Sequence, residues 1–401
     1  MAEKQKDRII DKVMFYEIPV FKTKLRIVEL LFILAIVILG AVLRMVFIDY
    51  ETHDWKYYIY NWMYEIKSNG GFRALGEPIG DYTAPYMYIL TILTYTKFTM
   101  LHAVKYVSIV FDYVAAVLLF LIVHEVTGSK HRAMFGFAAL VLLPSVIVNG
   151  AMWAQCDIIY TTFLLLSVYF MLKENSFFSV LSFAIAFSFK LQAVFLLPFL
   201  MILWLKQRVC FRHFALVPLV YVMVSIPEVL LGRSFTELMT VYIRQTGAYS
   251  KELSLQYPNI YQLIGNVDTE HMAVAGVVFT IALLGGLAYW LYTKKFTMTK
   301  EIIITLALFT VMLTVFFLPK MHERYGFMVD LLAAAYAVCD LRKIYVAILV
   351  NLCSVLTYFM EIAALTTVPI VVLAVVMGVL LCVVGYDLYQ KVQQEELCPL
   401  E

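Results

Sequence analysis

Apolar stretches of about 20 residues recur along the whole chain and limit the folds that are open to it. Hydrophobic residues make up 63% of the 401 residues and charged residues 15%, whereas soluble domains carry roughly 45–50% and about 25%. Such runs cross a bilayer as helices, because a helix satisfies its own backbone hydrogen bonds in lipid. The sequence therefore predicts an all-α polytopic membrane protein.

The expected membrane segments follow one another with short polar connections. The run 176–205 is too long for one span and holds Lys190 at its middle, so we expect two short helices that meet there. This reading predicts about 11–13 membrane segments. The runs lie near residues 28–48, 84–101, 105–126, 133–149, 157–172, 176–205, 214–231, 272–292, 301–318, 327–339, 343–363 and 367–386.

One transmembrane domain is expected over residues 27–386, with a charged cytoplasmic segment before it (1–26) and a cytoplasmic tail after it (387–401). No small-residue cleavage site follows the first run, which indicates a retained anchor. Basic connections mark the cytoplasmic side and place two outer loops, about 49–85 and 233–271, on the extracytoplasmic face of the cell membrane. The basic connections are Lys130–Arg132, Lys206–Arg212, Lys294–Lys300 and Arg342–Lys343.

This topology contains one conflict. Two apolar runs, 84–101 and 105–126, separate the first outer loop from Lys130–Arg132, although a change of side needs an odd number of crossings. Either one of the runs is short or re-entrant, or Lys130–Arg132 lies outside. The sequence leaves both alternatives open.

The first outer loop concentrates polar groups in an otherwise apolar chain. Between Asp49 and Tyr88 it carries six carboxylates and two tryptophans. Apolar and aromatic residues recur at helical spacing from Asp54 to Lys67, which predicts an amphipathic helix lying at the membrane interface. Arg44 lies one turn inside the preceding span, from where its side chain is expected to reach toward these carboxylates or an anionic ligand.

Two carboxylates of this loop stand next to span ends. Asp49 follows the first span and Asp81 precedes the next run, so both are expected to meet at the outer membrane face. A carboxylate there can take the proton of an attacking hydroxyl as the new bond forms. The simpler alternative is a solvated acidic loop without a catalytic role.

Two further sets of charges lie between or within apolar runs. Lys320, His322, Glu323 and Arg324 occur within five positions, where the cations suit a phosphate. Lys190 needs a partner or an anionic ligand, and a buried acid such as Asp157 or Asp112 is the alternative partner. An ordinary interfacial charge cluster is the alternative for the first set.

Short motifs elsewhere in the chain carry a family resemblance. They are Asp49-Tyr50-Glu51, Trp62, Gly70-Gly71, Ala74-Leu75, Asp81-Tyr82 with Pro85-Tyr86, Trp153-Ala154-Gln155-Cys156-Asp157, Phe189-Lys190-Leu191-Gln192, Tyr242 with Gln245, Leu253-Ser254, Pro258-Asn259 with Tyr261, and the stretch Pro319 to Tyr325. Their order over about residues 27–340 resembles that of GT-C-fold glycosyltransferases, especially bacterial mannosyltransferase-like proteins related to the GPI-anchor second mannosyltransferase. Ala84 and Ala154 depart from that pattern, which has proline and glycine there.

The resemblance implies a GT-C-like bundle and a hexosyltransferase that uses a polyprenyl-phosphate-linked sugar. It implies Asp49 as the general base, with Asp81 sharing that role or positioning the acceptor. The donor phosphate would be held by His322 and Arg324, with Lys320, Arg244 and Lys190 in support. Residues expected to position the substrates are Glu51, Asp54, Asp157, Gln192, Tyr82, Gln245 and Asn259.

The same resemblance requires no metal or other cofactor, with a cation bound by the carboxylates as the alternative. The acceptor would be a glycan, a glycolipid or a protein, and membrane lipids would surround the chain. A net charge of +2 without a basic patch predicts no nucleic-acid partner. The six cysteines form no CxxC or Cys/His motif, which predicts neither a disulfide framework nor a zinc site. A transporter, a flippase or a ligase for lipid-linked saccharides remains the alternative function.

Overall fold

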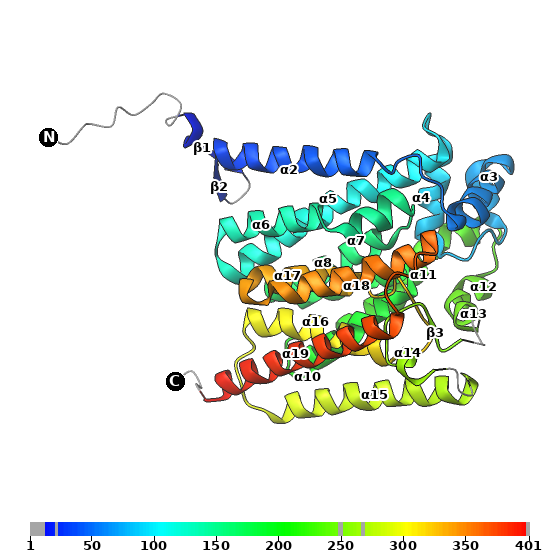
Figure 1. The fold of residues 1–401 in the computed structure, drawn as a ribbon. Coiled ribbons are helices and arrows are strands. Elements are labelled where there is room, and N and C mark those ends of the chain that lie inside the picture. The colour runs from blue at the N-terminus through cyan, green and yellow to red at the C-terminus, as the bar shows by residue number, and fades with distance from the viewer. Residues whose placement is uncertain (1–12, 21–22, 248–251, 266–268, 398–401) are drawn as a thin grey trace.

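The structure, a computed structural model, describes residues 13–20, 23–247, 252–265 and 269–397, and most of them are helical. The rest of the expected N-terminal segment, of the second outer loop and of the tail lies outside the described residues. The described helices form one bundle in which most axes run parallel or antiparallel (Figure 1). The predicted all-α architecture is confirmed.

Seven of the described helices are long and apolar enough to cross a membrane. Helix α6 (Lys130–Val141) is followed by the segment Pro144–Met152, and the two meet at an angle of 43°. This segment comprises α7 (Pro144–Ile147) and the π-helical turn η3 (Val148–Met152). If α6 and the segment count as one bent span, the described residues contain eight candidate spans. The seven are α2 (Ile27–Met45), α5 (Met100–Thr127), α11 (Leu216–Leu230) with η5 (Phe211–Ala215), α15 (Thr269–Thr293), α16 (Lys300–Phe317), α18 (Ile344–Ala363) with η6 (Leu341–Lys343), and α19 (Ile370–Leu397). The chain is thus a polytopic membrane protein.

Shorter apolar helices fill the interior of the bundle. All residues of helix α17 except the last are buried, so this helix contacts the surrounding helices and not lipid. The predicted count of about 11–13 segments includes these shorter helices. They are α4 (Ala84–Thr94), α8 (Asp157–Leu172), α9 (Ser176–Phe189), α10 (Leu197–Leu205) with η4 (Leu191–Leu196), and α17 (Phe327–Cys339).

The interfacial helix of the first outer loop begins as the π-helical turn η1 (Trp55–Ile59) and continues as α3 (Tyr60–Ser68). Its buried face carries Trp55, Ile59, Met63 and Ile66, at the spacing that the sequence predicts. The helix ends at Gly70, whose φ of 90° lies in the left-handed region that glycine adopts without strain. The 3-10 turn η2 (Gly71–Gly76) then leads toward α4.

The remaining elements are short and lie at the two ends of the bundle. An antiparallel hairpin of β1 (Glu17–Val20) and β2 (Thr23–Arg26) precedes α2. At the other end, β3 (Ser254–Leu255) pairs in parallel with β4 (Met321–His322). The second outer loop also contains α12 (Phe235–Met239), α13 (Val241–Gly247) and α14 (Tyr261–Ile264). The expected tail boundary at residue 386 falls inside α19, which continues as one helix to Leu397.

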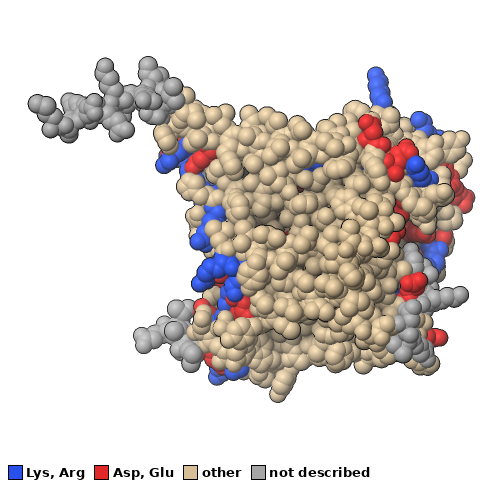
Figure 2. All heavy atoms as spheres, in the orientation of Figure 1, with Lys and Arg blue, Asp and Glu red and all other residues tan. Residues whose placement is uncertain are grey.

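Charged side chains gather at the two ends of the bundle, and the surface between them is almost free of them in this view (Figure 2). Blue Lys and Arg atoms line the left edge of the view, whereas most red Asp and Glu atoms lie at the right. Connections expected to be cytoplasmic, such as that between α5 and α6, lie at the left end in Figure 1. An excess of Lys and Arg marks the cytoplasmic side of membrane proteins.

The length of α4 resolves the topological conflict. Its 11 residues span about 17 Å, too little to cross an apolar core of about 30 Å. It packs against η2 and α11 near the end of the bundle that holds α3. Only α5 therefore separates the first outer loop from Lys130–Arg132, and the two lie at opposite ends.

Arg44 does not reach the first outer loop, contrary to the prediction. Its side chain is fully buried, its Nε lies 2.7 Å from Asp112 Oδ2, and its Nη1 donates to the carbonyl of Val141 at 2.9 Å. A buried carboxylate attracts the guanidinium more strongly than exposed ones do, because little water screens the pair. Arg44 thus links α2 to α5 and α6.

The topology can be tested by labelling single cysteines with a membrane-impermeant maleimide in a background that lacks the native cysteines. We expect Ser129→Cys and Lys295→Cys to be labelled from one side of the membrane and Ser68→Cys from the other, since α4 does not cross. Sealed vesicles of defined orientation provide the measurement. Labelling of Ser129→Cys from the same side as Ser68→Cys would show that α4 crosses.

Candidate active site

Segments that are distant in sequence meet at the end of the bundle that holds the first outer loop. Thr52 Oγ1 donates to the carbonyl of Trp153 at 3.2 Å, and Thr83 Oγ1 donates to that of Phe189 at 3.0 Å. Five ionisable side chains meet here and form what we call the charge cluster. They come from the first outer loop, the start of α8, the break between α9 and η4, and the stretch that follows β4. Its members are Asp54, Asp157, Lys190, Glu323 and Arg324.

Asp54 is the carboxylate of the first outer loop that belongs to the charge cluster. Its Oδ2 accepts a hydrogen bond from Gln155 Nε2 at 2.7 Å and another from Arg324 Nη1 at 3.1 Å. The side chain is 24% exposed, so one side of the carboxylate faces outward. Charge-assisted bonds to a single oxygen fix its orientation. Asp54 Oδ1 accepts no hydrogen bond from the residues that the structure describes.

Arg324 is surrounded by carboxylates. Besides Asp54, its Nη1 lies 3.4 Å from Glu323 Oε1 and its Nε 3.8 Å from Asp157 Oδ2. Its guanidinium also lies over the ring of Trp153, 5.4 Å from the centroid. Burial lowers the pKa of Arg324, but the three carboxylates outweigh it and raise the pKa well above its usual value. Arg324 is therefore a fixed cation whose charge is already compensated.

Lys190 forms an ion pair with Asp157, the alternative that the sequence analysis left open. Lys190 is the extended residue between α9 and η4, so the predicted break places its side chain in the interior. Asp157, at the first turn of α8, is 1% exposed and also accepts from Asn149 Nδ2 at 2.9 Å. The pair holds the ends of α8 and α9 together, and Lys190 is compensated before any phosphate binds.

Several buried polar atoms near the charge cluster have no hydrogen-bond partner among the described residues. Leaving such an atom unpaired costs about 1–3 kcal/mol, so their grouping favours a polar ligand at this place. Gln192, predicted to position a substrate, contributes one of them. The atoms are Arg324 Nε, Gln192 Oε1, Asn149 Oδ1 and Tyr86 Oη.

Tyr82 lies in a row of aromatic rings that leads inward from the interfacial helix. Ring centroids are 6.1 Å apart between Tyr58 and Trp62, 5.7 Å between Trp62 and Tyr82, and 4.7 Å between Tyr82 and Tyr86. Lys190 Nζ lies 5.8 Å from the centroid of Tyr82. Burial, first among the causes, raises the pKa of Tyr82 well above 10, so its hydroxyl stays neutral.

Glycine is required at position 80 beside this row. The φ of Gly80 is 67°, and a Cβ atom there would lie 2.9 Å from the indole ring of Trp62. The turn between η2 and α4 therefore presses directly on Trp62. This contact holds the Trp62 ring in its position between the interfacial helix and Tyr82.

The two carboxylates predicted to be catalytic lie apart from the charge cluster. The side chain of Asp49 is 86% exposed, and its Oδ1 accepts a hydrogen bond from His102 Nε2 at 2.7 Å. The exposed Asp81 contributes its backbone carbonyl, which accepts from the side chain of Gln245. No hydrogen bond or ion pair within the described residues joins either carboxylate to the cluster. Their catalytic roles stay predictions.

Other predicted phosphate ligands flank Arg324. His322 lies on β4, 3.6 Å through Nδ1 from Glu323 Oε2, and its ring is 4.9 Å from that of Tyr325. Lys320 has a φ of 60° and is fixed by its backbone N–H, which donates to the carbonyl of Leu253 at 2.7 Å. Parallel pairing of β4 with β3 thus holds both residues beside the cluster.

The remaining predicted residues have contacts of their own. Arg244 is 53% exposed and lies 3.1 Å from Glu237, while Glu51 lies 3.3 Å from Lys56 at the surface. Asn259 is buried and accepts from the backbone N–H of Tyr261 at 3.2 Å, as a turn residue does. These contacts do not join them to the charge cluster.

Sequence reasoning assigned no role to Gln155, Glu323 or His102, each of which contacts one of the acidic or cationic candidates. Gln155 and Glu323 stand inside the recognised motifs, so their spacing was a usable signal. His102 lies 53 residues from Asp49, between the apolar runs 84–101 and 105–126, and nothing in the sequence marks the contact. Among the described residues, no group of three or more His, Cys, Asp or Glu side chains is arranged to hold a metal ion.

No known protein family matches this chain. A search of curated proteins finds no matching relative either.

The ion pair of Lys190 and Asp157 is expected to stabilise the folded protein. Lys190→Met should lower the free energy of unfolding by about 3 kcal/mol, because it leaves a buried carboxylate without its nearest cation. Unfolding in mixed detergent micelles measures this change. The double variant Lys190→Met/Asp157→Leu is the matched control and should recover much of the loss. A single variant as stable as the wild type would show that the pair does not contribute.

Proposed function

We propose that the protein is an integral-membrane glycosyltransferase that moves a monosaccharide from a polyprenyl-phosphate carrier to an acceptor hydroxyl. The observation that carries the proposal is the Asp54 carboxylate, fixed through Oδ2 by Gln155 and Arg324 and partly exposed at the end of the bundle. A fixed carboxylate at headgroup depth suits a reaction between a lipid-linked donor and an acceptor that arrives from the aqueous side. The motif resemblance supports the same reaction class.

In the proposed step, the acceptor oxygen attacks the anomeric carbon of the donor sugar while Asp54 Oδ1 takes the hydroxyl proton. The bond between the anomeric carbon and the phosphate oxygen breaks, its electron pair leaves with polyprenyl phosphate, and the configuration inverts. Arg324 and Gln155 position Asp54 and stay bound to Oδ2. Because the geometry is set beforehand, little reorganisation is needed during the reaction.

Asp54 replaces Asp49 as the proposed base for a geometric reason. Asp54 lies among the motif segments 153–157 and 319–325, whereas Asp49 is bonded to His102 and open to solvent. A base has to lie within about 2.6–3.2 Å of the hydroxyl that it deprotonates, and the donor must reach the same point. The gathering of motif residues around Asp54 favours that point.

The leaving phosphate is assigned to Lys320 rather than to Arg324 or Lys190, with support from His322, whose Nδ1 lies 3.6 Å from Glu323 Oε2. The latter two already contact carboxylates, so a phosphate would have to displace Asp54 or Asp157 from them. Lys320 and His322 stand on the neighbouring turn and strand. Positive charge there stabilises the phosphate most when its negative charge develops in the transition state.

The membrane orientation belongs to the same proposal. Lys and Arg gather at the end of the bundle opposite the charge cluster, which favours a cytoplasmic position for that end (Figure 2). The site then opens to the extracytoplasmic face of the cell membrane. The acceptor is a glycan, a glycolipid or a protein on that face.

The test uses the purified protein in nanodiscs with a panel of radiolabelled short-chain polyprenyl-phosphate sugars and crude envelope acceptor. Wild-type protein should move label from one donor into the acceptor. Asp54→Asn should reduce transfer by about 10²–10⁴-fold, the usual contribution of a general base, without loss of donor binding. Asp49→Asn is the comparison and should retain most of the transfer.

Three outcomes would overturn parts of this proposal. Transfer that is lost in Asp49→Asn but kept in Asp54→Asn would return the base to Asp49. Transfer that persists in both would move the base to another residue. No transfer from any donor, together with saturable binding of a lipid-linked oligosaccharide, would favour a transporter or a ligase.

A further inference from the structure

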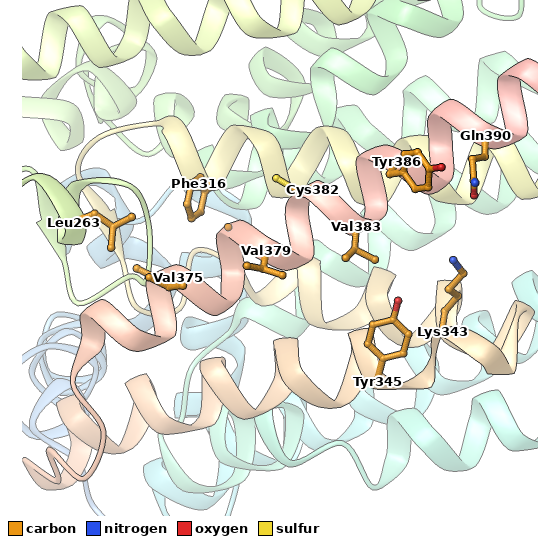
Figure 3. Close-up of a pocket in the computed structure, with 12 residues that line it drawn as sticks. Leu263, Phe316, Lys343, Tyr345, Val375, Val379, Cys382, Val383, Tyr386 and Gln390 are labelled. Carbon is orange, nitrogen blue, oxygen red and sulfur yellow. The ribbon is translucent and has the colours of Figure 1, made fainter.

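A groove on the outside of the bundle is lined by residues that do not belong to the charge cluster. It has a volume of about 690 Å³ and follows α19, with α16 and α18 contributing to its walls (Figure 3). Ala374, Gly378 and Cys382 recur every fourth residue along α19, so small side chains lie in a line along it. A trough with a floor of small residues suits a linear apolar chain.

The groove is amphiphilic along its length. Leu263, Phe316 and Val375 lie at one end of the groove, and Lys343, Tyr345 and Gln390 lie at the other end (Figure 3). From Val375 to Gln390 the helix rises about 22 Å, most of the thickness of a bilayer's apolar core. One end thus offers only apolar contacts, and the other offers an ammonium, a hydroxyl and an amide.

The polar end carries more positive than negative charge. Asp387 Oδ1 lies 3.0 Å from Lys343 Nζ, and Asp387 Oδ2 lies 2.8 Å from Lys391 Nζ. Two ammonium groups share this one carboxylate, so the group of three has a charge of +1. Lys343 is 22% exposed, so its ammonium stays accessible from the groove. An anionic headgroup completes the balance of charge.

From this complementarity we propose that the groove binds one anionic glycerophospholipid of the leaflet at the basic end of the bundle. One acyl chain lies along α19 between Val379 and Tyr345, and the phosphate lies at Lys343. A zwitterionic lipid carries no net charge and gains less from the same site. The bound lipid fills the space between α18 and α19 near their basic ends.

Native mass spectrometry of the purified protein tests the proposal with phosphatidylglycerol and phosphatidylcholine of matched chain length, added separately. We expect the wild type to retain one phosphatidylglycerol, bound about fivefold more tightly than phosphatidylcholine, the effect of about one lysine at a membrane surface. Lys343→Gln should abolish this preference. Lys295→Gln, an exposed lysine outside the groove, is the matched control and should keep it.

A second pair of variants tests the apolar part of the groove. Val379→Trp fills the groove and should abolish the retained lipid, whereas Val372→Trp changes a similarly exposed valine of α19, two turns away and outside the lining of the groove, and should not. Equal binding of both lipids to the wild type, or equal effects of the two tryptophans, would show that only non-specific annular lipid is bound. The readout does not involve glycosyl transfer, so it is independent of the proposed activity.

Discussion

The cost of burying charge in an apolar bundle governs this structure. Arg44 pairs with Asp112, and Lys190 pairs with Asp157, in surroundings where an uncompensated ion would be costly. Lys105 solves the same problem differently, by donating to the carbonyls of Phe47, Ile48 and Tyr50 at 2.6–3.0 Å. Each contact joins segments that are far apart in sequence. The charges therefore select the order in which the spans pack.

The candidate site depends on interruptions of helices at one end of the bundle. The π-helical turn before Trp153, the extended residue Lys190 and the left-handed Lys320 each turn the backbone away from regular helix. Such breaks are tolerated at this depth because protein, not lipid, surrounds them. They bring polar side chains to a position that uninterrupted spans would leave apolar.

Much of the fold can be predicted from the sequence, because apolar run length and basic connections report directly on membrane solvation. The break at Lys190 and the interfacial helix over Trp55–Ser68 follow from the same reasoning. The membership of Asp54, and not of Asp49, in the charge cluster does not. Both lie in one acidic stretch, and only the tertiary contacts of Gln155 and Arg324 distinguish them. The partner of Arg44 does not follow for the same reason, since the sequence marks Asp112 only as an alternative partner of Lys190, whereas the structure pairs it with Arg44.

The bond between Asp54 and Arg324 also has a consequence for biogenesis. It joins residues 270 positions apart, one near the first span and the other just before α17. A nascent chain inserts its early spans long before Arg324 leaves the ribosome, so Asp54 has no such partner during most of synthesis. The charge cluster therefore forms only after about four fifths of the chain has been made, and a product truncated before Arg324 lacks this bond.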